Sequence, residues 1–469
     1  MDAAFAHLID GELVAGSDHF AVVNPATGAP FARCPSATRA ELERAVAAAT
    51  AAFRGPWRGD DAARRETLRR MAEVTRSAAA ELGRLVALEQ GKPLAMAEAE
   101  AHAAAQIFDL YAGETVPCEV LREGPAGRVT LERRPLGVTA AITPWNYPLA
   151  TLAMKLAPAL LVGNTVVAKP SPFTPLSSLA LAARLREVVP PGAVNVLGGS
   201  DQVGAWLTAH PGVRKVAFTG SIATGKRIVH AGADDLKRLT LELGGNDPAI
   251  VLPDVEVGAV APSLFWSAFL NSGQICMAIK RIYAHRDVYE PLVAELSGLA
   301  RAARVGDPLE PGTELGPVSS RAQLERVAGL VDDARRRGGR VSAGGAPLAG
   351  PGFFYPPTIV ADVPADAALV TEEQFGPALP VVPFDDVDDV LAQANATHYG
   401  LCGSVWTADA ERGARLARRL ECGTVWVNRH MDLGHDAPFG GVKWSGLGWE
   451  NGRWGIDQYC DLQVVHAPA

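Results

Sequence analysis

Short apolar segments alternate with helix-like segments between Leu136 and Leu243, and this alternation constrains the fold more than any other feature. The apolar segments cover 137–142, 164–168, 193–197, 214–218 and 238–241. The segments between them have helical patterns and cover 149–161, 175–188, 201–209 and 223–232. Neighbouring parallel strands need a crossover connection, which is usually a helix. The pattern therefore predicts βαβ units that form a parallel sheet with helices on both faces.

A second stretch of the same kind begins after residue 247. Its helices are predicted over 256–270, 287–304, 320–337 and 408–420. Apolar residues at helical spacing predict further helices over 39–54, 60–90 and 95–113. Residues 119–123 and 128–133 flank a Gly-Pro-Ala-Gly turn and predict a hairpin. At ~150 residues per domain the length suits two or three domains. The predicted fold class is α/β, with two Rossmann-like three-layer domains and a small β element.

Composition and charge exclude several classes of protein. Hydrophobic residues make up 48% of the chain and charged residues 20%, as is typical of folded globular proteins. The net charge of −8 argues against nucleic acids and anionic membranes as partners. No run of ~18 apolar residues is present, and the N-terminal segment lacks the basic start of a signal peptide. Six scattered cysteines suit a reducing, cytoplasmic compartment, and no histidine pairs with a cysteine at metal-ligand spacing.

A glycine-rich loop at 220–226 is a candidate phosphate site. Its sequence, GSIATGK, imitates a P-loop, but Arg227 stands where a Mg²⁺-binding Ser or Thr is required. The loop joins a predicted strand to a predicted helix, so its backbone N–H groups lie where a helix N-terminus can bind phosphate. No GxGxxG fingerprint supports it, and the same residues could form a tight turn that binds nothing.

Three residues have side chains that suit covalent catalysis. Cys276 follows small polar residues and is expected at the start of a helix, whose dipole would stabilise a thiolate. Glu242 ends a predicted strand and could be a general base. Asn146 lies between Pro144 and Pro148, where a rigid amide could stabilise an oxyanion. The simpler alternatives are a small buried thiol, a surface cap and a structural amide.

Seven motifs, taken together, resemble those of the aldehyde dehydrogenase superfamily, whose hydrolytic members depend on NAD(P). They are TPWN at 143–146, KPS at 169–171, FTGS at 218–221, ELGG at 242–245, GQIC at 273–276, EQFGP at 373–377 and PFGG at 438–441. One such motif is weak support, whereas seven in family order across nearly the whole chain are strong support.

The resemblance implies a mechanism in which Cys276 attacks the aldehyde carbon as a thiolate. The Asn146 amide and the Cys276 N–H would form the oxyanion hole. Hydride transfer to the nicotinamide would leave a thioester, and Glu242 would activate the water that hydrolyses it to a carboxylic acid. Lys155 and Glu450 stand where the family has auxiliary residues for this base, although both could instead be surface residues.

The resemblance also implies a dinucleotide site, in which Lys169 and Glu373 would hold the two riboses. The full set of implied cofactor residues is Thr143, Pro144, Trp145, Lys169, Ser171, Gly220, Ser221, Gly225, Gly244, Glu373 and Phe375. Many NAD-dependent members have a Glu where this chain has Pro172. Its loss removes an attraction for ribose hydroxyls and a repulsion of a 2′-phosphate. NAD is the expected cofactor, and Pro172 leaves NADP open.

Substrate residues are implied less specifically, for a small-molecule aldehyde. The positions that flank the substrate funnel in similar proteins are here Tyr147, Met154, Ile275 and Met277. Their character suits a medium-sized aliphatic or aromatic aldehyde. The loop 429–436 differs from the family's common versions and forms either a solvated rim or a selector of polar substrates. Its charged and imidazole side chains are Arg429, His430, Asp432 and His435.

The expected domain organisation also follows from the resemblance. Residues 1–117 and 135–243 would form the dinucleotide-binding domain, and 244–445 the catalytic domain. Residues 118–134 and 446–469 would be bridging elements that pair between subunits, so a homodimer or homotetramer is expected. Two alternative functions are an acylating enzyme that passes the thioester to coenzyme A, and a binding or structural protein that has lost the chemistry.

Overall fold

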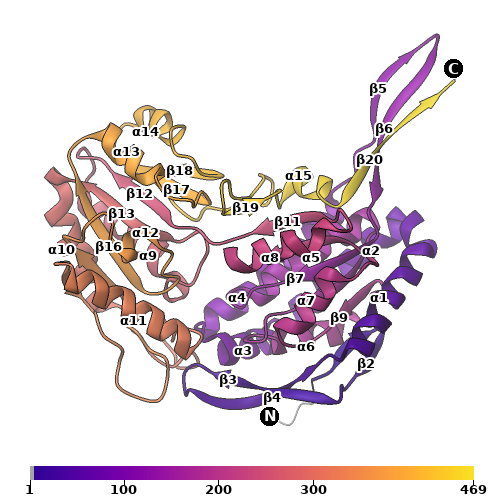
Figure 1. Cartoon of the computed structure of the whole chain (residues 1–469), viewed down its shortest axis with the longest axis horizontal. Coiled ribbons are helices and arrows are strands. Elements are labelled where there is room, and N and C mark those ends of the chain that lie inside the picture. Colours follow the sequence, from indigo (N-terminus) through magenta and orange to yellow (C-terminus); the bar gives the residue numbers. More distant parts are fainter. Residues whose placement is uncertain (1–4, 469) are drawn as a thin grey trace.

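The first large sheet contains the five strands predicted between 137 and 241. The computed structural model describes residues 5–468 (Figure 1). In spatial order the strands are β19 (Gly446–Leu447), β11 (Arg238–Glu242), β10 (Val213–Thr219), β7 (Val138–Ile142), β8 (Thr165–Lys169), β9 (Val194–Val196), β1 (His7–Ile9) and β2 (Glu12–Val14). The central five are parallel, as predicted. The antiparallel strands at the two ends of the sheet, β19 at one end and β1 and β2 at the other, were not predicted, because two or three residues are too few for a periodic pattern.

Helices cover both faces of this sheet, which confirms the three-layer prediction. They are α1 (Arg39–Arg54), α2 (Asp61–Ser77), α3 (Ala79–Gln90), α4 (Leu94–Gly113), α5 (Pro148–Val162), α6 (Leu176–Leu185), α7 (Asp201–Ala209) and α8 (Ile222–Ala233). Alternate residues of β8 belong to different hydrophobic clusters: Val166 and Ala168 pack with α5 and α6, and Val167 packs with α1 and α7. The single helix predicted over 60–90 is wrong. The chain breaks at Ala78, where α2 and α3 pack separately against α4 and no Gly or Pro marks the break.

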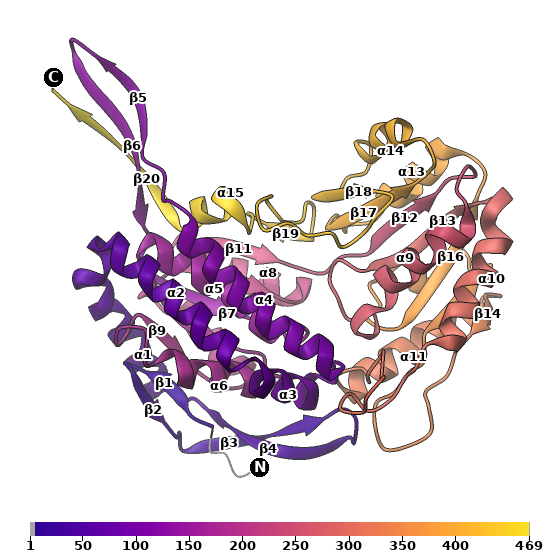
Figure 2. The same cartoon turned by 180° about the vertical axis from the view of Figure 1, so that it is seen from behind.

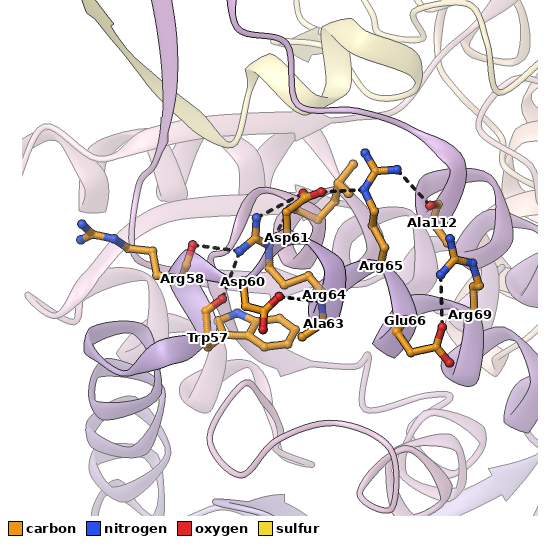
Figure 3. Close-up of polar contacts among 11 residues, drawn as sticks. Trp57, Arg58, Asp60, Asp61, Ala63, Arg64, Arg65, Glu66, Arg69 and Ala112 are labelled. Atoms are coloured by element: carbon orange, nitrogen blue, oxygen red, sulfur yellow. Dashed lines mark hydrogen bonds and ion pairs between the residues drawn. The ribbon is translucent and has the colours of Figure 1, made fainter.

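A buried arginine joins the N-terminal helices to the end of α5. Arg64 in α2 donates to the backbone oxygens of Trp57 and Arg58, at 3.1 and 2.8 Å, and to Leu161 at 2.9 Å. Figure 3 shows the contacts of Arg64 with Trp57 and Arg58, together with its contact with the Asp61 carboxylate. Trp57 and Arg58 belong to the short helix η1 (Pro56–Gly59). These bonds satisfy carbonyls that a helix terminus leaves unpaired and fix one end of α5, which carries predicted site residues.

The second large sheet is also mainly parallel. Its strands are, in spatial order, β14 (Arg340–Ala343), β15 (Thr358–Ala361), β16 (Ala378–Phe384), β13 (Ile279–His285), β12 (Asp247–Val251), β17 (Cys402–Trp406) and β18 (Thr424–Val427). Only the β14–β15 pair is antiparallel. The associated helices are α9 (Val257–Phe269), η2 (Leu270–Gly273), α10 (Arg286–Ala302), α11 (Arg321–Arg336), α12 (Ala368–Thr371), α13 (Val387–Asn395) and α14 (Ala410–Ala417). Gly338 follows α11 with φ +96°, the conformation in which glycine commonly ends a helix.

The predicted hairpin is present as β5 (Glu119–Gly124) and β6 (Gly127–Pro135). The C-terminal strand β20 (Cys460–Ala467) pairs antiparallel with β6, and this three-stranded sheet projects away from the rest of the chain (Figures 1 and 2). The short helix α15 (Gly452–Asp457) precedes β20, and β3 (Asp18–Asn24) and β4 (Ala29–Ser36) form a separate ribbon. Within residues 5–468, no helix combines the length and apolarity needed to cross a bilayer.

Candidate active site

The carboxyl ends of four neighbouring parallel strands open into one cavity of about 1050 Å³. Ile142, Lys169, Thr219 and Glu242 are the last residues of β7, β8, β10 and β11, and all four line it. The C-terminal edge of a parallel sheet is where α/β proteins bind ligands. All the predicted site residues line this cavity except Lys155 and Gly225.

Asn146 lies in the turn between β7 and α5 and connects the two halves of the cavity. Its side-chain Nδ2 donates to the backbone oxygen of Gln274 at 2.9 Å, in the segment that leads to Cys276. Its own backbone oxygen accepts from Lys92 Nζ at 3.0 Å. An amide nitrogen carries two hydrogens, so one remains available to a ligand.

Cys276 does not begin a helix, so the expected stabilisation by a helix dipole is wrong. It lies in a turn between η2 and β13. Burial raises the pKa of its thiol to about 12, and the positive charge of Lys280 opposes only part of that effect. The backbone N–H of Cys276 has no hydrogen-bond acceptor in the described part of the chain. The site therefore holds a protonated thiol beside a free backbone donor.

Glu242 is buried at the end of β11, which excludes the surface-cap alternative. Its side chain lines the cavity, only 4% of the residue is exposed, and both carboxylate oxygens are without a partner in residues 5–468. Burial and the negative charge of Glu450 raise its pKa well above the usual value of 4.5. A buried carboxyl with a raised pKa is suited to proton transfer near neutral pH.

Lys155 and Glu450 are also buried, so neither is a surface residue. Lys155 Nζ lies 2.6 Å from Glu450 Oε1 and donates to Thr219 Oγ1 at 2.8 Å. Thr219 pairs in register with Glu242 on the adjacent strand. Lys155 thus lies behind the cavity wall, and its charge is neutralised by Glu450. Thr219 was not assigned a role from the sequence, although it belongs to one of the motifs.

The part of the cavity where the sequence predicts the cofactor contains polar groups that lack protein partners. Lys169 is buried without an acceptor or ion-pair partner among the described residues, and burial lowers its pKa to about 8. The buried Thr143 hydroxyl is likewise unpaired within residues 5–468. Burial raises the pKa of Glu373 to about 7, and its Oε1 accepts from the Gly245 N–H at 3.1 Å. Such groups fit a ligand that is rich in hydroxyls, such as a dinucleotide.

The glycine-rich loop follows β10 and begins α8, as predicted. Ser221 is the N-cap of α8, and its Oγ accepts from Thr224 N at 3.3 Å. Gly225 does not line the cavity but packs against Leu243, where an added Cβ would lie 2.7 Å from a methyl carbon. Its role is therefore close packing of α8 beside the ELGG segment.

Helix α11 holds the 373–375 segment, which the sequence did not indicate. Gln323 Nε2 donates to the backbone oxygens of Gln374 and Phe375, at 2.8 and 2.7 Å, and Arg326 donates to that of Glu373 at 2.7 Å. Ile107, Asp201 and Phe439 are other lining residues that were missed. Phe439 belongs to the PFGG motif but was given no role, whereas Ile107 and Asp201 match ordinary helix patterns and carry no local signal.

The loop 429–436 has both an exposed and a buried side. Arg429 and Asp432 form an exposed ion pair at 2.6 Å, as a solvated rim would. His435 lines the cavity, whereas His430 is buried behind Met277. Neither expected role describes the whole loop. Within residues 5–468, no group of three His, Cys, Asp or Glu side chains could hold a metal ion.

Comparison with known proteins identifies relatives that cover the whole chain. The model of the aldehyde dehydrogenase family matches residues 13–465. The chain is 38% identical to a betaine aldehyde dehydrogenase of Cereibacter sphaeroides, over 99% of this chain and 97% of that one. It is 39% identical to a 3-sulfolactaldehyde dehydrogenase of Pseudomonas putida, over 97% and 96%. The structure of a Bacillus cereus aldehyde dehydrogenase in complex with NAD⁺ superposes with a TM-score of 0.97 at 36% identity, over 100% and 97%.

Proposed function

The chain belongs to the aldehyde dehydrogenase family and oxidises an aldehyde with NAD(P), and we propose that Cys276, Asn146 and Glu242 perform the chemistry. One observation supports this assignment above all. A thiol, an amide donor and an unpartnered carboxyl, which come from three distant segments, line a single cavity. Asn146 also donates to the Gln274 carbonyl, whereas the Glu242 carboxyl has no other partner in residues 5–468 that would explain its burial.

In the proposed mechanism, Cys276 loses its thiol proton to water in the cavity and its sulfur bonds to the aldehyde carbon, while the carbonyl π electrons move onto the oxygen. Asn146 Nδ2 and the Cys276 N–H stabilise the oxygen, which becomes negatively charged. Lys169 and Glu373 would hold the ribose groups of NAD(P), which would supply the hydride acceptor for the same carbon. Glu242 then takes a proton from the water that hydrolyses the thioester. Burial raises the pKa of Glu242 most, the charge of Glu450 raises it further, and the charge of Lys155 lowers it.

A turnover assay with and without coenzyme A tests this function against its alternatives. NAD(P)H absorbance is followed with a panel of aldehydes, and we expect turnover with water alone. A strict requirement for coenzyme A would instead favour the acylating alternative, in which a hydrolytic base is not needed. Cofactor binding without turnover of any aldehyde would favour a binding or structural protein.

We propose that the substrate is an uncharged aliphatic or aromatic aldehyde. Many of the residues that line the cavity are apolar, among them Ile107, Ala150, Met154, Leu433 and Phe439. The cations that line the cavity belong to its cofactor part: the end of β8, helix α8 and the contact to Glu373. An anionic aldehyde such as 3-sulfolactaldehyde would have to bury an unpaired charge beside Cys276. A cationic one such as betaine aldehyde could pair only with the carboxyls of Glu242 and Glu450, which the proposed mechanism uses for the hydrolytic water. We expect kcat/KM for hexanal and benzaldehyde to exceed that for both charged aldehydes by about tenfold or more. Equal or higher values for either charged substrate would contradict this assignment.

We propose NAD as the preferred cofactor, and Pro172→Glu as the variant that tests the basis of that preference. Pro172 lines the cavity beside Lys169 and Ser171, and Asp201 lies close enough for its charge to raise the pKa of Lys169. The carboxylate of Asp201 disfavours a 2′-phosphate, and a second carboxylate at 172 would do so more strongly.

We expect Pro172→Glu to lower kcat/KM for NADP at least about tenfold, or ~1.4 kcal/mol, and to lower KM for NAD. Unchanged use of NADP would show that position 172 does not face the adenosine ribose.

We propose that the chain forms a homodimer or homotetramer through its three-stranded sheet. Val120, Leu121, Leu462 and Val464 are exposed apolar residues of β5 and β20. A sheet this small needs packing against another surface. Sedimentation of the full chain should show a dimer or tetramer, and a monomer at assay concentration would contradict the proposal.

The six free thiols also support a cytoplasmic location, which cell fractionation can test.

A further inference from the structure

His430 is the buried residue of the loop 429–436: its side chain has no exposed surface and is hydrogen-bonded to the segment that contains Cys276. Its Nε2 lies 2.9 Å from the backbone oxygen of Met277, and its Nδ1 lies 2.9 Å from Ser404 Oγ on β17. The ring also packs against Trp426, with centroids 4.8 Å apart. These contacts hold the imidazole from three sides.

The hydrogen bonds determine which tautomer of His430 is present. A carbonyl oxygen can only accept, so Nε2 must carry the hydrogen that is donated to Met277. Burial lowers the pKa of His430 to about 3, so the ring is neutral and Nδ1 is an acceptor. Ser404 Oγ donates to Nδ1 and itself accepts from Trp406 Nε1 at 2.9 Å. A directed chain of donors therefore runs from Trp406 through Ser404 and His430 to Met277.

A second buried donor acts on the other side of Cys276. Lys280 Nζ donates to the backbone oxygen of Ile275. That carbonyl and the Cys276 N–H belong to the same planar peptide group, so the bond also fixes the direction of the proposed oxyanion donor. The carbonyls of Ile275 and Met277 are thus both held from behind by side chains that do not line the cavity.

We propose that His430 is a positioning residue for the Cys276 nucleophile, which it holds through the carbonyl of Met277 as a neutral imidazole with its tautomer set by Ser404. The inference rests on the proposed function of Cys276. The proposed chemistry gives His430 no role, and this inference assigns it one. Only a few backbone dihedral angles lie between the two peptide groups that are held, so the two hydrogen bonds together fix the backbone at Cys276. Loss of either hydrogen bond lets this backbone turn and moves the thiol away from the Asn146 amide.

Substitutions that keep or remove a donor at the position of Nε2 test this proposal. In His430→Gln, the side-chain amide nitrogen can reach the Met277 carbonyl. In His430→Asn the side chain is too short to reach it, and in His430→Leu there is no donor. We measure the pre-steady-state burst of NAD(P)H, the rate of Cys276 alkylation by iodoacetamide, NAD affinity and thermal stability. We expect the Leu and Asn variants to lose about 10²-fold in burst rate and alkylation, as for a misplacement of ~1 Å, and the Gln variant to stay within about threefold of the parent. NAD affinity should not change in any of them.

Two further variants make the test specific. Arg429→Gln changes the neighbouring, exposed residue of the same loop and should leave both rates unchanged. Ser404→Ala frees the tautomer of His430 and should reduce both rates by about three- to tenfold, which also provides a result if His430→Leu does not fold. Equal rates for the Gln and Asn variants, or a normal burst in the Leu variant, would overturn the positioning role. Those outcomes leave the proposed function intact, because that function is tested separately, by turnover without coenzyme A and by the Cys276→Ala and Glu242→Gln variants.

Discussion

Cys276→Ala is expected to reduce aldehyde oxidation by about 10⁴-fold or more, because no other group can form the covalent bond to the aldehyde carbon. The side chain is small and lies in a turn, so its loss should not unfold the chain. NAD affinity should stay within about twofold of the parent, because the proposed ribose contacts at Lys169 and Glu373 are untouched. Steady-state turnover and fluorescence titration with NAD are the two measurements.

Cys118→Ala is the matched control, because Cys118 is an exposed free thiol that does not line the cavity. We expect it to have normal activity. If Cys276→Ala retains more than about a tenth of the parent rate, the thioester mechanism is wrong for this chain. If the variant loses NAD binding as well, the loss of activity would say nothing about the covalent step, and a Cys276→Ser variant would be needed to separate the two effects.

Glu242→Gln is expected to slow steady-state turnover by about 10²- to 10⁴-fold, the range that general-base catalysis supplies. The two side chains have nearly the same shape, and neither carboxylate oxygen of Glu242 has a partner to lose within residues 5–468. The thioester should still form and then accumulate. A stopped-flow trace should therefore keep a burst of NAD(P)H near one equivalent per active site, followed by a slow phase. An unchanged steady-state rate would remove Glu242 from the role of base.

The pH dependence of the parent enzyme gives an independent check on Glu242. A base acts only when ionised, and burial and Glu450 raise the pKa of this carboxyl well above 4.5. Turnover should therefore be present at high pH and be lost as the pH falls through that raised pKa. The acidic limb of the kcat profile should lie well above pH 4.5 in the parent and be absent from Glu242→Gln. A parent limb near pH 4.5 would mean that the carboxyl is solvated during catalysis.

The alternation of strands and helices was sufficient to predict the central parallel sheet, because buried parallel strands are short continuous apolar runs. It could not predict β1, β2 and β19, because each has only two or three residues and is recognised as a strand only from its pairing with a neighbouring strand. It also joined α2 and α3 into one helix, since the break at Ala78 follows from packing against α4 and not from a local breaker.

The sequence by itself determined the family, the order of the motifs and the residue types at the candidate site, because these depend only on chemical identity and spacing along the chain. Only the tertiary structure decided the state of those residues. Cys276 lies in a turn with a raised thiol pKa, and Lys155 meets Glu450 across a separation of 295 residues. His430 and Arg429 are adjacent in one polar loop, yet one is buried against Met277 and the other is exposed. Burial and partners arise from segments that meet only in the fold, and desolvation by those segments sets the proton affinities on which the chemistry depends.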